Sequence, residues 1–234
     1  MFDFATTPVM VVGLLVLFGW CTGWSVRETA VPQSTAHRVS NGLHLLMSVV
    51  MLLMVSPLTW RPLVLAVPLP VWVALFFVAS AWFVVQGVRH RGNPGEARHF
   101  AAHSLMFLAM VWHLGGMMVR AAAAGMTPGT GKHNPDRMVE AGLTPVAMVV
   151  AGIGVPFMIY LLTATVIALA RAVRPVGASL QPVMDAGGCH EARPVGGVTD
   201  RLAALSEAAM VFGMFWMSIG LVTPLVPVLS VLRV

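Results

Sequence analysis

Apolar residues run along this chain in long stretches, and charged residues, glycine and proline gather between them. The apolar stretches cover approximately residues 8–24, 39–56, 64–88, 99–119, 143–170 and 202–222. A helix of about 20 predominantly apolar residues crosses the hydrocarbon core of a bilayer. The pattern therefore predicts an all-α fold, a polytopic membrane helical bundle of about six transmembrane helices.

Glycine and proline refine these boundaries. Pro57 and Pro224 are predicted to mark the ends of the second and sixth helices, because proline cannot continue the hydrogen-bond ladder of a helix. Gly154 and Pro156 are predicted to bend the fifth helix, which is long for a bilayer. We expect a single membrane domain, residues 1–234, built as three weakly repeated helical hairpins over about 8–56, 64–119 and 143–222.

The second, fourth and sixth stretches share one pattern, in which a polar residue is followed by methionines at offsets of +3, +7 and +10, with one histidine substitution. The three groups are His44, Met47, Met51 and Met54; His103, Met106, Met110 and His113; and Glu207, Met210, Met214 and Met217. On an α-helix these offsets fall within a stripe roughly 80° wide. Each of the three helices is therefore predicted to present a polar residue and a line of sulfur atoms on one face.

The three motif helices are expected to run in the same direction, because each is the second helix of a hairpin. An arginine precedes each group, which predicts similar depths in the membrane. If the hairpins pack around a pseudo-threefold axis, the stripes form four rings about 4.5–6 Å apart. The innermost ring is predicted to contain His44, His103 and Glu207, and the three rings beyond it the methionines and His113.

This arrangement of ligands predicts a site for a soft metal ion, Cu(I) above all. Thioether sulfur is neutral and soft, so it binds Cu(I) and Ag(I) in preference to Na⁺, Mg²⁺ or Ca²⁺. Successive similar sites are what conduction of an ion requires. Glu207 is the only acidic residue inside an apolar stretch, and we expect it to pair with a cation, to pair with His44 or His103, or to be protonated.

Composition supports a membrane protein and excludes a nucleic-acid partner. Of the 234 residues 58% are hydrophobic and only 10% are charged, against roughly a quarter charged in soluble domains. The net charge of +5 comes from arginines at the ends of the stretches rather than from a basic run interleaved with aromatic residues. The main partner is therefore the lipid bilayer.

The distribution of basic residues predicts the orientation. One side collects Arg27, Arg38, Arg89, Arg91, Arg98, Arg171, Arg174, Arg193 and Arg201. The other side collects Arg61, Arg120, Lys132, Arg137 and Arg233. The positive-inside rule places the first set in the cytoplasm and both termini outside. The bias toward Ala, Val, Gly, Pro and Arg, with one lysine, is typical of a bacterium with GC-rich DNA, so we expect a bacterial plasma-membrane protein.

Two resemblances follow from these motifs. The methionine pairs 47/51, 106/110 and 210/214 match the M-x-x-x-M motif of the eukaryotic high-affinity copper transporter family, which stacks methionine rings at a threefold axis between three identical subunits. The resemblance is one of site, and it implies that this chain supplies all three motifs itself. The whole chain also resembles a family of small multi-pass actinobacterial membrane proteins with His-x-x-Met-x-x-x-Met helices, a resemblance that implies no particular activity.

Other interpretations of the same residues stay open. Methionine is a common packing residue, so a single stripe usually indicates helix packing. His44 and His103 at matched depth are also compatible with a haem-binding electron-transfer protein. A third hypothesis is a copper-loading accessory subunit of a membrane oxidase, with a copper donor or acceptor protein as partner. No nucleophile pattern or nucleotide motif is present, so a transporter or metal-binding protein is favoured over an enzyme.

Two loop tracts are interpreted as solvated loop rather than as ligands, because short metal-like tracts are weak signals. They are Met126, His133 and Met138 in the loop after the fourth stretch, and Cys189, His190 and Glu191 in the loop after the fifth.

Overall fold

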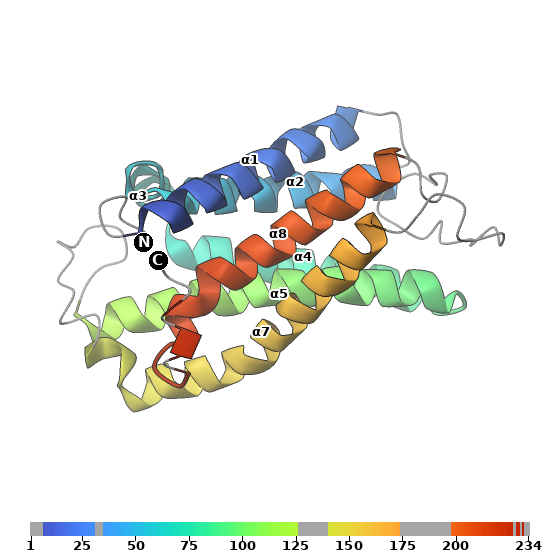
Figure 1. The fold of residues 1–234 in the computed structure, drawn as a ribbon. Coiled ribbons are helices and arrows are strands. Elements are labelled where there is room, and N and C mark those ends of the chain that lie inside the picture. Colours follow the sequence, from blue (N-terminus) through green and yellow to red (C-terminus); the bar gives the residue numbers. More distant parts are fainter. Residues whose placement is uncertain are drawn as a thin grey trace.

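The computed structural model describes residues 7–30, 35–125, 140–173, 198–226, 228–229 and 231. Its helices are α1 (Pro8–Ala30), α2 (Thr35–Val55), α3 (Pro57–Ala66), α4 (Leu69–Arg89), α5 (Pro94–Ala123), α7 (Pro145–Ala172) and α8 (Val198–Val222) (Figure 1). In the described residues, six helices are long and apolar enough to cross a membrane: α1, α2, α4, α5, α7 and α8. The predicted all-α bundle is therefore confirmed, and the chain is a multi-pass membrane protein. The loop tracts that contain His133 and His190 lie outside the described residues.

The short helix α3 was not predicted from the sequence. The apolar pattern predicts that the third span begins near Val64, but Val64 belongs to α3 and the span itself begins at Leu69. The Ser56 hydroxyl accepts a hydrogen bond from the backbone N–H of Leu58 at 3.2 Å, and Pro57 occupies the first helical position. A serine cap followed by proline is a standard start for a helix. The pattern failed here because α3 and α4 are both apolar, so the turn between them does not interrupt the hydrophobic run.

The predicted ends of the second and sixth helices agree with the structure, whereas α1 continues past the predicted end at residue 24 to Ala30, and α5 begins at Pro94, before the predicted start at residue 99. Helix α2 ends at Val55, and α8 ends at Val222, two residues before Pro224. Helix α7 continues as one helix through Gly154 and Pro156, and the predicted bend at these residues stays a prediction.

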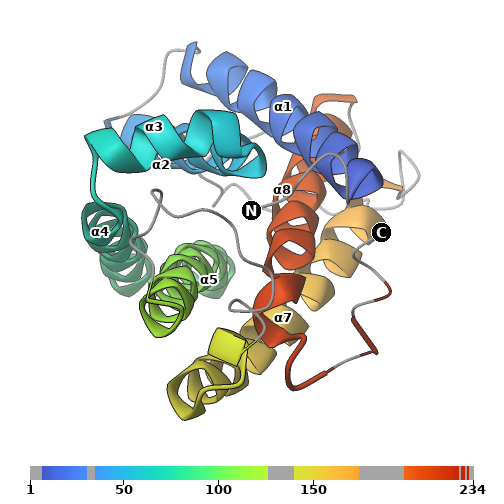
Figure 2. The same ribbon diagram turned by 90° about the vertical axis from the view of Figure 1, so that its left-hand side faces the viewer.

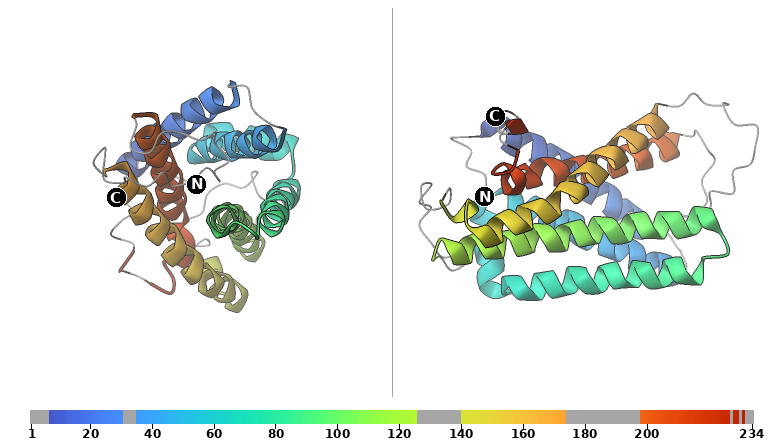
Figure 3. Two further views of the ribbon diagram at one scale, coloured as in Figure 1. Left: turned by 90° about the vertical axis from the view of Figure 1, so that its right-hand side faces the viewer. Right: turned by 90° about the horizontal axis from the view of Figure 1, so that it is seen from below.

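The six spans pack as three hairpins. The most extensive helix pairs are α1 with α2, α4 with α5, and α7 with α8, which confirms the predicted hairpin arrangement. The contacts of α1 with α8 and of α5 with α7 then join the hairpins (Figures 2 and 3). The first helix of each hairpin exposes large apolar side chains on its outer face, as lipid-facing helices do, whereas a larger share of α2, α5 and α8 is buried. The three motif helices are therefore the inner helices.

Glycines allow α1 and α8 to approach closely. A Cβ atom at Gly13 would lie 2.7 Å from the Trp216 ring, and one at Gly213 would lie 2.5 Å from the Phe18 ring. Each helix thus places an aromatic ring over a glycine of the other. Small residues serve this purpose in membrane helices, where packing rather than water exclusion drives association.

A similar notch joins α5 to α7. A Cβ at Gly154 would overlap the ring of Trp112, and the Trp112 Nε1–H donates a hydrogen bond to the carbonyl oxygen of Val150 at 2.7 Å. Closer to the C-terminal end of α5, Arg120 donates hydrogen bonds to the carbonyl oxygens of Gly220 (2.6 Å) and Leu221 (3.1 Å). These carbonyls belong to the last turn of α8, which has no intrahelical donors for them. Together these contacts fix α5 against both helices of the third hairpin.

Candidate metal centre

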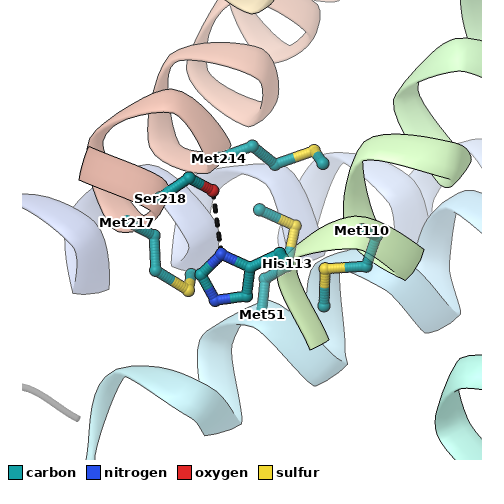
Figure 4. Close-up of a pocket in the computed structure, with 6 residues that line it drawn as sticks. All are labelled: Met51, Met110, His113, Met214, Met217 and Ser218. Carbon is teal, nitrogen blue, oxygen red and sulfur yellow. Dashed lines mark hydrogen bonds between the residues drawn. The ribbon is translucent and has the colours of Figure 1, made fainter. Parts of the chain in front are cut away.

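One small pocket collects side chains from all three inner helices (Figure 4). Helix α2 supplies one methionine, α5 supplies one methionine and one histidine, and α8 supplies two methionines and one serine. The lining residues are Met51, Met110, His113, Met214, Met217 and Ser218. The three methionines of the third predicted ring, Met51, Met110 and Met214, therefore face the same pocket. Two members of the fourth predicted ring, His113 and Met217, face it as well.

The pocket is dry and apolar. All six lining side chains are buried, and Met51 is fully inaccessible to solvent. The space that they enclose is too narrow to admit a water molecule. Its polar atoms come from His113 and Ser218, and the remaining lining groups are thioethers. A ligand of this pocket must therefore be small, free of its hydration shell and compatible with sulfur.

His113 is held by a neighbour that the sequence analysis missed. Its Nδ1 lies 2.8 Å from the Ser218 hydroxyl of α8, and both residues are buried. Ser218 directly follows Met217 but lies outside the stripe of offsets, so the methionine pattern does not include it. The sequence did offer one signal for Ser218, because it is a serine within an apolar stretch and directly follows a predicted ligand.

A histidine cluster forms a second polar group between α2 and α5. The rings of His44 and His103 have centroids 4.5 Å apart, which places these two residues at matching depth, as the register of the motifs predicts. His103 Nε2 also lies 2.7 Å from Nε2 of His99, one turn earlier on α5. The rings of Phe83 and Phe107 pack against His44. This packing places the two imidazoles in direct contact, without a slot for a porphyrin plane between them.

Glu207 is not placed with these histidines. Its carboxylate accepts a hydrogen bond from the Arg171 guanidinium of α7 at 3.0 Å, and both side chains are partly exposed. Among the expectations for Glu207, pairing with a cation is the one that the structure bears out. Arg171 lies thirty-six positions earlier on the neighbouring helix, so no local pattern identified it as the partner.

The remaining predicted ligands are buried in the apolar core, outside the lining of this pocket. They are Met47, Met54, Met106 and Met210. Within the part of the chain that the structure describes, no group of three or more His, Cys, Asp or Glu side chains is arranged to hold a metal ion. The donor set of the pocket is of a different kind, four thioethers and one imidazole.

Comparison with known proteins shows the family to which the chain belongs. No curated protein and no solved structure matches the chain. A family model described as "Domain of unknown function (DUF5134)" matches residues 36–221, a range that begins in α2, ends in α8 and contains every residue of the pocket. The chain therefore belongs to the DUF5134 family.

Proposed function

We propose that this protein binds Cu(I) at the pocket between α2, α5 and α8 and handles or transports the ion within the membrane. One observation carries the proposal: four thioethers and one imidazole, from three helices, meet in one buried pocket. The proposal does not depend on the predicted ligands that lie outside this pocket.

The donor chemistry favours a soft monovalent ion. Thioethers and a neutral imidazole suit Cu(I), whereas Mg²⁺ and Ca²⁺ need about six oxygen ligands, and the lining of this pocket offers one side-chain oxygen, the Ser218 hydroxyl. The charge matters too, because the cost of moving an ion from water into a medium of low dielectric constant rises with the square of its charge. A neutral set of ligands in a membrane therefore accepts a monovalent ion far more readily than a divalent one.

The narrowness of the pocket supports direct coordination. A hydrated ion does not fit in a space that excludes one water molecule. Methionine has three rotatable bonds and a polarisable sulfur, so the thioethers adjust to a bare ion without moving the helices. Exchange of the hydration shell for protein donors is also the basis of selectivity in ion pathways.

The position of the histidine cluster relative to the pocket suggests a route for the ion. His103 precedes Met110 by seven residues on α5, which corresponds to about 10 Å along the helix axis. Met47 and Met106 are buried at the intermediate level on α2 and α5. We infer a path along the seam between α2 and α5, from the histidine cluster through these methionines to the pocket. We further infer a bacterial plasma-membrane location with both termini outside, based on the distribution of arginines.

The test is the metal content of the purified protein after incubation with Cu(I) under reducing conditions. The variant Met51→Leu/Met110→Leu/Met214→Leu removes three sulfurs and changes little in volume, so each substitution should cost less than about 1.5 kcal/mol of stability. We expect near-stoichiometric copper in the wild-type protein and a large loss in the variant.

A matched control separates loss of ligands from loss of packing. Met10, Met118 and Met158 lie in or against the apolar core but outside the pocket. The variant Met10→Leu/Met118→Leu/Met158→Leu should bind as much copper as the wild type. Equal copper in all three proteins, or none in any, would return the methionines of the pocket to a packing role.

A copper-loading accessory subunit of an oxidase would use the same pocket. Co-purification with an oxidase, together with loss of oxidase copper on deletion, would assign that more specific role. The haem hypothesis is not favoured, because the rings of His44 and His103 are in direct contact.

A further inference from the structure

We propose that Ser218 is a positioning residue that makes Nε2 of His113 the nitrogen donor of the pocket. This inference rests on the proposed function, and it names the atom and the supporting group on which the mixed sulfur and nitrogen site depends. It starts from the contact between His113 Nδ1 and the Ser218 hydroxyl, 2.8 Å long and buried between α5 and α8.

The chemistry of imidazole links this contact to the identity of the donor atom. A neutral imidazole carries one proton, and a metal binds at the nitrogen that lacks it. A histidine ligand almost always donates its other N–H to a hydrogen-bond acceptor, which fixes the tautomer and the orientation of the ring. Ser218 occupies Nδ1, so Nε2 remains as the donor. Figure 4 shows this second nitrogen on the side of the ring away from Ser218.

Serine is suited to this role in both states of the site. A hydroxyl group donates and accepts hydrogen bonds. With no ion bound, the Ser218 O–H can donate to Nδ1 while Nε2 carries the ring proton. With an ion bound, the proton moves to Nδ1 and is donated to the Ser218 oxygen. The same side chain therefore holds the ring in one orientation before and after binding.

The orientation of the His113 ring matters because imidazole is a directional ligand. A thioether side chain has three rotatable bonds and can direct its sulfur in several ways, whereas the imidazole offers one lone pair in one direction. His113 and Ser218 come from different helices, so the contact also sets the position of α5 relative to α8 at the level of the pocket. Loss of the hydroxyl should release the ring while leaving all five donor side chains in place.

The first experiment measures the affinity for Cu(I), and for Ag(I) in parallel, by competition with a chelator of known affinity. Removal of a supporting group beside a metal ligand typically costs 10–100-fold in affinity. We expect Ser218→Ala to lose about that factor, with the stoichiometry unchanged, and Ser218→Thr to retain affinity within a few-fold because it keeps the hydroxyl. Ser206→Ala, which removes another buried hydroxyl of α8 away from the pocket, is the control and should match the wild type.

A second measurement is independent of overall stability. Nitrogen-15 NMR of the His113 ring in the Ag(I)-loaded protein should show the proton on Nδ1 and the metal on Nε2. In a His113→Met background, Ser218→Ala should have no further effect on affinity, because the group that it positions is gone. Silver on Nδ1, or an equal loss in the His113→Met background, would overturn the assignment.

The outcomes separate this inference from the proposed function. If the wild-type protein binds neither ion, both are overturned. If the wild type binds the ion and Ser218→Ala binds it equally well, the pocket stands as a metal site and the role of Ser218 is overturned.

Discussion

Two ionisable side chains on the inner helices, His113 and Glu207, have different surroundings although both belong to the same sequence motif. His113 is buried among thioethers and bonded to Ser218. Glu207 of α8 is paired with Arg171 of α7. The sequence pattern places these residues on one face of each helix, but that face covers a wide arc. The packing of the neighbouring helices then determines which side chains on that face reach the pocket.

This difference predicts that Glu207 contributes little to metal binding in the pocket. Both members of the Arg171–Glu207 pair are more than a third exposed, and exposed pairs contribute about 0–1 kcal/mol. We expect Glu207→Gln to leave the stoichiometry of bound Cu(I) unchanged and to lower the free energy of unfolding by less than about 1 kcal/mol. Metal analysis and chemical denaturation of the purified variant would check both. Loss of copper in this variant would instead restore Glu207 to the metal site.

At the scale of single helices, what the sequence predicts well is local. The six apolar spans and the common register of His44 with His103, and of Met51 with Met110 and Met214, follow from helical periodicity and hairpin alternation. The partners Ser218 and Arg171 were missed because each reaches its contact from a different helix. Helix α3 was missed for another reason: a capped turn between two apolar helices leaves the hydropathy unchanged.

Helix packing also depends on contacts that composition does not reveal, and Gly154 on α7 is the sharpest case. A methyl group there would overlap the Trp112 ring, whose Nε1–H is already bonded to α7. Overpacking typically costs about 1–3 kcal/mol, and we expect Gly154→Ala to destabilise the protein by a similar amount. Gly115→Ala is the matched control, because a methyl group at Gly115 would meet no atom of a neighbouring element within 4 Å. Thermal unfolding in detergent would compare them, and equal melting temperatures would contradict a tight α5–α7 notch.

At the scale of the whole molecule, each hairpin divides its two helices between lipid and core. Helices α1, α4 and α7 present large apolar side chains outward, and α2, α5 and α8 meet inside. In the described residues, α5 and α8 are the pair of inner helices with the closest backbone packing. The inner helices therefore approach one another mainly through long side chains. Methionine suits such an interior, because its length and flexibility fill the space between separated helices.

This architecture makes orientation a testable property of the whole bundle. Gly92 lies in the exposed turn between α4 and α5, beside three of the arginines assigned to the cytoplasm, and Leu58 is 85% exposed at the start of α3 on the opposite side. In a Cys21→Ala/Cys189→Ser background, we expect Leu58→Cys to react with a membrane-impermeant thiol reagent in intact cells. Gly92→Cys should react only in inverted vesicles.

The reverse labelling pattern would invert the topology and place the histidine cluster on the outer side. The ion path would then begin at His99 and His103 outside the cell and lead inward to the pocket. The labelling therefore decides which end of the path faces the cytoplasm. It does so without altering the pocket, because Leu58 and Gly92 lie at the exposed ends of the bundle and neither residue lines the pocket.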